Sequence, residues 1–134
     1  MLEGVGRALA PAGAPLRGRP LFPRGAMTEA QLVRKIISAV GARYPRAYVR
    51  KLADRHSRGI PDLLIVYPRE LDCGHHATGV LFVECKSATG RVSRIQQAEH
   101  AAIARVGTLH GCSVLVARDV QNVLYTLELW GAVK

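Results

Sequence analysis

Three charged residues stand inside segments that otherwise have the apolar character of buried strands. Asp62 opens the run DLLIVY, and Glu84 and Lys86 lie two positions apart in LFVECKS. Because side chains two apart in a strand point to the same face, Glu84 and Lys86 should share one face while Cys85 points to the other. Such charges are costly to bury unless they are paired or bind a metal ion. A Glu–Lys pair at a sheet edge is the simplest interpretation of these two residues alone.

Asp62 favours a catalytic interpretation over a simple ion pair. If its strand neighbours the strand of Glu84, the two carboxylates converge on one point. Two carboxylate oxygens and a backbone carbonyl suit a hard cation such as Mg2+ or Mn2+. Such an ion lowers the pKa of a bound water and polarises a phosphoryl oxygen. Lys86, on the same face, would hold or deprotonate that water and offset the charge that develops on the phosphate.

The composition indicates one domain that binds a polyanion. The chain has 134 residues, enough for a single core, and 19 Lys and Arg against 10 Asp and Glu give a formal charge of +9. Nucleic acid is the commonest polyanion inside cells, although a coding bias toward Arg is an alternative cause. An odd number of cysteines without framework spacing favours reduced thiols in the cytoplasm. No apolar run approaches the roughly 18 residues of a membrane span.

The pattern of apolar and capping residues predicts seven elements around the charged residues. They are a helix over 28–44 capped by Thr28, strands over 47–52, 62–67 and 80–86, a helix from Ser93 to 106, a strand over 112–117 and a helix capped by Asp119. Residues 68–79 are predicted to form a polar connection. The order α-β-β-β-α-β-α is typical of a mixed β-sheet flanked by helices.

Residues 1–26 differ from the rest of the chain. They are rich in Gly, Ala, Pro and Arg, a composition that prevents a regular helix or strand. We expect either a disordered basic arm, which would add phosphate contacts, or a mis-assigned start that places the natural first residue at Met27. The folded domain is then expected over 27–134.

Pro61-Asp62 followed by Glu84-Cys85-Lys86 resembles the signature of the PD-(D/E)XK nucleases. The longer stretches GIPDLLIV and FVECKSATGRVSRIQQAEHAAIARVG resemble the VRR-NUC branch of that superfamily. That branch has an acid on its first helix, a basic loop before G-x-P-D, then E-x-K, a glycine turn and S-x-x-Q opening a helix. The matching positions are Glu29, Arg55 to Arg58, Asp62, Glu84, Lys86, Gly90, Ser93 and Gln96. The resemblance covers nearly all of 28–120 and implies an α/β, restriction-endonuclease-like core.

The resemblance implies a role for each matching residue. The catalytic residues would be Asp62, Glu84, Lys86, Gln96 and Glu29. The metal ligands would be Asp62, Glu84, the backbone carbonyl of Cys85 and, through water or at a second ion, Glu29. Alternatively, Glu29 is a surface acid that the helix dipole stabilises, and Gln96 is a solvated amide. The DNA-binding residues would be Arg55, His56 and Arg58 in the basic loop, with Arg91 and Arg94 at the entry to the second helix.

The function that the resemblance implies is metal-dependent, structure-selective cleavage of DNA. Stand-alone VRR-NUC proteins of viral and bacterial type are associated with four-way junctions, so we expect branched DNA, a homodimer, a cytoplasmic location and a phage or bacterial origin. The alternatives are a catalytically silent DNA-binding module, a flap or general DNA nuclease, and an enzyme that acts on RNA. A zinc site at CGHH, residues 73–76, is not favoured because no second pair of ligands has finger-like spacing. His100 and His110 have no partner that the sequence identifies.

Overall fold

A four-stranded mixed sheet forms the centre of the molecule, for which the computed structural model describes residues 26–52, 58–107 and 110–134. The elements are α1 (Glu29–Arg43), β1 (Tyr48–Lys51), β2 (Leu63–Glu70), β3 (His76–Cys85), α2 (Arg94–Ala104), β4 (Cys112–Ala117) and α3 (Val120–Leu129). The strand order is β1-β2-β3-β4, and β3 and β4 form the parallel pair. This confirms the predicted order of elements and the mixed sheet.

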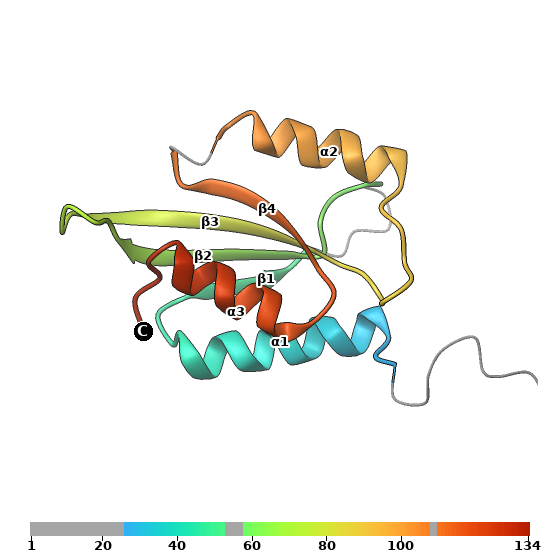
Figure 1. The fold of residues 1–134 in the computed structure, drawn as a ribbon, viewed down its shortest axis with the longest axis horizontal. Helices are drawn as coiled ribbons and strands as arrows, with labels where there is room; N and C mark the ends of the chain where they lie inside the picture. Colours follow the sequence, from blue (N-terminus) through green and yellow to red (C-terminus); the bar gives the residue numbers. More distant parts are fainter. Residues whose placement is uncertain (1–25, 53–57, 108–109) are drawn as a thin grey trace, which may run out of the picture.

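The two faces of the sheet are covered differently. On one face, alternate residues of β2 and β3 such as Leu63 and Val83 are fully buried against α1 and α3. On the other face lies α2, alone and close to β4 (Figure 1). None of the eleven residues of α2, all of which the structure describes, is buried. The main core therefore lies between the sheet and the pair α1 and α3, and the face below α2 is the more open one.

The three predicted helix caps are present. Thr28 and Ser93 each form a capping box, in which the cap hydroxyl accepts from the third backbone N–H and a Gln side chain accepts from the cap N–H. Asp119 caps α3 by accepting from the backbone N–H of Asn122 at 2.8 Å. These local signals fix where α1, α2 and α3 begin.

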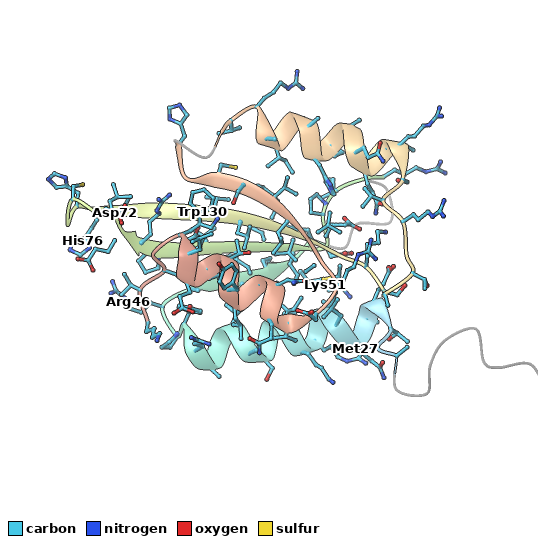
Figure 2. The ribbon with its side chains drawn as sticks, viewed as in Figure 1. Met27, Arg46, Lys51, Asp72, His76 and Trp130 are labelled. Carbon is cyan, nitrogen blue, oxygen red and sulfur yellow. The ribbon has the colours of Figure 1, made fainter. Side chains whose placement is uncertain are left out.

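The predicted polar connection over 68–79 is wrong, because β2 and β3 continue through it as an antiparallel hairpin. Their register runs from Leu63 opposite Val83 to Glu70 opposite His76, and Gly74, with a φ of 80°, lies in the turn. Polarity misled the prediction, since backbone hydrogen bonds hold a ladder whether or not its side chains are apolar. Figure 2 shows His76 at the tip of this hairpin and Lys51 toward the opposite end of the sheet.

The last residues of the chain pair with β2 beyond Tyr48, the first residue of β1. The backbone N–H of Glu70 donates to the carbonyl of Gly131, and that of Val133 donates to the carbonyl of Pro68. The guanidinium of Arg69 lies over the ring of Trp130, 5.7 Å from its centroid. Trp130 thus packs within its own chain. Among the described residues, no helix is long and apolar enough to cross a membrane.

Candidate active site

Asp62 lies immediately before β2 and reaches across to the end of β3. The register that pairs Leu63 with Val83 places Asp62 beside Glu84 in the neighbouring strand. Its Oδ2 accepts a hydrogen bond of 2.7 Å from the backbone N–H of Cys85. This bond fixes the carboxylate at the C-terminal end of β3, so the expected convergence of Asp62 with Glu84 is observed.

Glu84 and Lys86 form a buried ion pair on the α2 side of the sheet. The Nζ of Lys86 lies 3.3 Å from Oε1 of Glu84, and the two residues are 8% and 2% exposed. The intervening Cys85 is buried in the core on the other face, as predicted, and burial raises the pKa of its thiol to about 12. The pair therefore stands well inside the protein rather than at an exposed sheet edge.

Gln96 brings α2 onto this ion pair. Its Oε1 accepts from the backbone N–H of Ser93 in the capping box, which leaves its amide N–H groups free to point at the sheet. Nε2 then donates to Oε1 of Glu84 at 2.6 Å. Ser93 is thus a helix cap, and the side chain of Gln96 is ordered between the cap and Glu84 rather than solvated.

Glu29 approaches the same place from the start of α1. A side-chain carbon at Gly90 would lie 3.2 Å from Oε1 of Glu29 and 3.4 Å from Cδ of Lys86, so both side chains border this turn. Glu29 also lines a cavity of about 350 Å³ together with residues 87–89. The part of the chain that the structure describes contains no group of three His, Cys, Asp or Glu side chains able to hold a metal. Ligation by Glu29, through water or at a second ion, stays a prediction.

The burial of Glu84 controls its protonation. Desolvation, reinforced by the charge of Asp62, raises the pKa of Glu84 from 4.5 to about 7, and the nearby Lys86 opposes the shift. Without a further cation, the carboxyl group is therefore partly protonated near neutral pH. A cation beside Glu84 would favour the ionised form and lower this pKa.

Two residues near the site, His100 and Arg118, were not predicted to belong to it from the sequence. His100, one turn beyond Gln96 on α2, has its Nε2 3.8 Å from Oε2 of Glu84. Burial and the charge of Lys86 lower the pKa of His100, so its ring is neutral at neutral pH. Arg118 donates to the carbonyls of Ser87 and Gly90 at 2.6 and 2.9 Å and so fixes the turn that follows Lys86. Helical spacing from Gln96 was the one sequence signal for His100.

The described basic residues at the entry to the site are exposed. Arg58, Arg91 and Arg94 all have exposed side chains. Gly59 holds the segment of Arg58 against α2, since a side-chain carbon there would lie 2.7 Å from Cγ2 of Ile95. Arg55 and His56 lie outside the described residues, as does the segment 1–25. The DNA-binding roles of all five residues stay predictions.

Comparisons with known proteins agree with the fold and identify the family. Residues 16–119 match the VRR-NUC domain family, including part of the segment that the sequence analysis sets apart from the folded domain. The chain is similar to a solved structure described as a VRR_NUC domain, with 25% identity and a TM-score of 0.53 over 76% of this chain and 97% of that chain. None of the curated proteins matches it. Since the family match spans most of its length, the chain belongs to the VRR-NUC domain family, whose function is nuclease-type processing of DNA.

Proposed function

We propose that the chain is a divalent-metal-dependent endodeoxyribonuclease that hydrolyses a phosphodiester bond to leave a 5′-phosphate and a 3′-hydroxyl. The observation that carries the proposal is the buried pair of Glu84 and Lys86 at the point where Asp62 joins β3. A charged pair with an added carboxylate is costly in a small core. A nuclease needs this combination, whereas a protein that only binds DNA does not, which disfavours the catalytically silent alternative.

The donor atoms present fit a hard divalent cation. Oε2 of Glu84 is buried and has no hydrogen-bond partner among the described residues. With Asp62 and the backbone carbonyl of Cys85, it would supply the all-oxygen ligands that Mg2+ or Mn2+ prefers. When bound, such an ion polarises a phosphoryl oxygen and acidifies a coordinated water.

Lys86 and Gln96 are the chain's own contributions to the chemistry. Lys86 lies beside Glu84 with an ammonium group that would orient the attacking water and stabilise the negative charge on the phosphate in the transition state. Gln96 holds Oε1 of Glu84 and thereby its orientation. Glu29, at the edge of the same site, would bind the water ligands of the cation.

DNA would reach this site along the basic entry. Arg55, His56, Arg58, Arg91 and Arg94 would contact phosphates, and the net charge of +9 would attract the polyanion from a distance. Contacts to phosphates do not distinguish one base sequence from another, so they favour recognition of DNA shape. The three free cysteines favour a reducing, intracellular location. The proposed bacterial or phage origin rests on the resemblance to stand-alone members of the family.

We further propose a homodimer that acts on branched DNA, with four-way junctions preferred over flaps and linear duplex. One chain carries one site, and two symmetric cuts in a junction need two sites related by a two-fold axis. The apolar stretch around 123–130 is the candidate interface. Of its residues, Val123 and Leu127 are buried in the chain's own core, while Tyr125 and Leu129 are two-thirds exposed on α3 and available to a second copy.

A cleavage panel tests this function. Duplex, flap, fork and four-way junction DNA, with matched RNA, are incubated with Mg2+, Mn2+, Ca2+ or EDTA, and products are resolved on denaturing gels. We expect cutting of junction DNA with Mg2+ or Mn2+, little with Ca2+, and none with EDTA. Cutting in EDTA, or of RNA alone, would contradict the proposal. Equal cutting of duplex and junction by a chain that light scattering finds monomeric would leave a general DNA nuclease instead.

A further inference from the structure

Two buried polar atoms face each other at the end of β3 without a hydrogen bond. They are Oε2 of Glu84 and Nε2 of His100, which are 3.8 Å apart. The side chains that carry them are only 3% and 13% exposed. An unpartnered buried polar atom is costly, and here an acceptor and a ring nitrogen able to donate stand together in the same place. The mechanism described so far uses the carboxylate but not the imidazole.

The two oxygens of Glu84 have different surroundings. Oε1 already has two donors, Nε2 of Gln96 at 2.6 Å and Nζ of Lys86 at 3.3 Å. Oε2 has His100 as its neighbour and no bonded donor among the described residues. Because Gln96 and His100 are four residues apart, they lie on one face of α2. From that face, Gln96 contacts Oε1 of Glu84 and His100 lies beside Oε2.

We propose that His100 is a positioning residue of the nuclease site, whose Nε2–H donates to Oε2 of Glu84. The present separation exceeds a hydrogen bond by about 1 Å, which side-chain rotation can close. Each carboxylate oxygen has two lone pairs, so the bond leaves Glu84 able to hold a cation. With Gln96 on Oε1, α2 then fixes the carboxylate in both position and rotation. The inference rests on the proposed function, in which Glu84 is a metal ligand.

Residues that hydrogen-bond to a metal ligand strongly affect a metal site, although they do not contact the metal themselves. Carboxylates that bind metal are themselves hydrogen-bonded, and removal of such a bond typically lowers metal affinity or activity by about 10- to 100-fold. A hydrogen bond from the imidazole of His100 to Oε2 would orient Glu84 without competing for Oε1, which Gln96 and Lys86 already contact. This arrangement also explains why α2, which buries none of its residues, presents two polar side chains to the sheet.

Two substitutions separate positioning from packing. His100→Gln keeps an N–H donor at a similar reach, whereas His100→Leu fills similar space without one. His110→Leu is the control, because His110 is exposed and precedes β4, while Glu84 pairs with Val116 near the far end of that strand. Circular dichroism and thermal melting establish that each variant is folded.

The first measurement is Mn2+ affinity by calorimetry without DNA. We expect His100→Leu to weaken Mn2+ binding by about 10- to 100-fold, and His100→Gln and His110→Leu to stay close to wild type. Junction cleavage should follow the same order, with the decrease in kcat rather than an increase in KM. Equal behaviour of the Leu and Gln variants of His100, whether both intact or both impaired, would overturn the positioning role.

Two spectroscopic readouts complete the test. Pulsed EPR of bound Mn2+ should show no hyperfine coupling to a directly coordinated imidazole nitrogen. If wild type shows such a coupling and His100→Gln lacks it, His100 is a metal ligand and the proposal is overturned. Nitrogen-15 NMR of the metal-free ring should show a proton on Nε2 whose shift changes in Glu84→Ala, and an unchanged shift would also overturn it. If wild type neither binds Mn2+ nor cuts DNA, the proposed function fails, but the NMR result still decides whether His100 donates to Glu84.

Discussion

Asp62, Glu84 and Lys86 are the residues whose substitution should separate cutting from binding. All three meet at the end of β3 and are buried or half-buried, whereas the arginines that would contact phosphates are exposed. We expect Asp62→Ala, Glu84→Ala and Lys86→Ala each to abolish cleavage while DNA binding, measured by fluorescence anisotropy with Ca2+, is retained. Glu128→Ala, at an exposed ion pair with Arg43 on the other side of the sheet, should cut normally. Near-normal turnover in any of the three variants would disprove the site.

The raised pKa of Glu84 predicts a specific pH dependence of stability. Folding raises this pKa from 4.5 to about 7, so between these values the folded chain holds a proton that the unfolded chain has released. Stability from this group therefore falls as pH rises through that window. Glu84→Gln removes the effect and should gain up to about 3 kcal/mol relative to wild type between pH 4 and pH 8 in EDTA.

Urea unfolding at a series of pH values checks this expectation, with Glu128→Gln as an exposed control. A difference between Glu84→Gln and wild type that does not change with pH would contradict the assigned pKa. At high pH, addition of Mn2+ should make wild type more stable than Glu84→Gln, because the ion stabilises only the chain that retains Glu84.

The sequence predicts the positions of some side chains in the site and not of others. The alternation of a strand was enough to place Glu84 and Lys86 on one face and Cys85 on the other. His100 was missed because its partner lies 16 positions earlier in another element, and neither its type nor its spacing alone identifies an approach between α2 and β3.

Among the elements, the β2–β3 hairpin depends on a glycine for its packing. The ring of Tyr67 lies directly against Gly79, its partner in the register, where any side-chain carbon would collide with it. We expect Gly79→Ala to destabilise the chain by about 1–3 kcal/mol through this overpacking. Gly41→Ala is the matched control, since nothing lies within 4 Å of that site on α1. It should stabilise by about 0.5–1 kcal/mol.

Chemical denaturation of both variants measures these two effects. A Gly79→Ala variant as stable as wild type would show that the tyrosine ring moves aside without cost. Cleavage by Gly41→Ala should be unchanged, because that position is exposed on α1 and away from the site.

Element boundaries followed the strength of their local signals. Thr28, Ser93 and Asp119 act within three residues of their own position, so the sequence located all three helix starts. The hairpin of β2 and β3 gave no such signal. Its outer half pairs through the backbone and is supported by Gly131 and Val133, from the far end of the chain.

For the molecule as a whole, charge should dominate the binding of DNA. Removing one cation–phosphate interaction flattens the slope of log affinity against log salt concentration by about 0.9 on duplex DNA. We expect the triple substitution of Arg58, Arg91 and Arg94 by Ala to weaken all DNA structures alike and to flatten this slope by about 2–3. Anisotropy titrations over a range of salt concentrations measure it.

The same titration on a chain without residues 1–26 tests the basic arm. A slope unchanged by that deletion would show that the arm makes no phosphate contact. A slope unchanged by the triple substitution would place the DNA elsewhere on the surface.

Incubation with a supercoiled circular DNA that extrudes a four-way junction from an inverted repeat tests the proposed activity most directly, because a circle without ends reports internal cuts only and this one carries the preferred substrate. With Mg2+ or Mn2+, wild type should convert the circle to nicked and linear forms with 5′-phosphate ends. The reaction should stop in EDTA and with Lys86→Ala. Circles left intact by the wild-type chain with either ion, or cut equally well by Lys86→Ala, would contradict the assignment of Asp62, Glu84 and Lys86 as a metal-dependent endonuclease site.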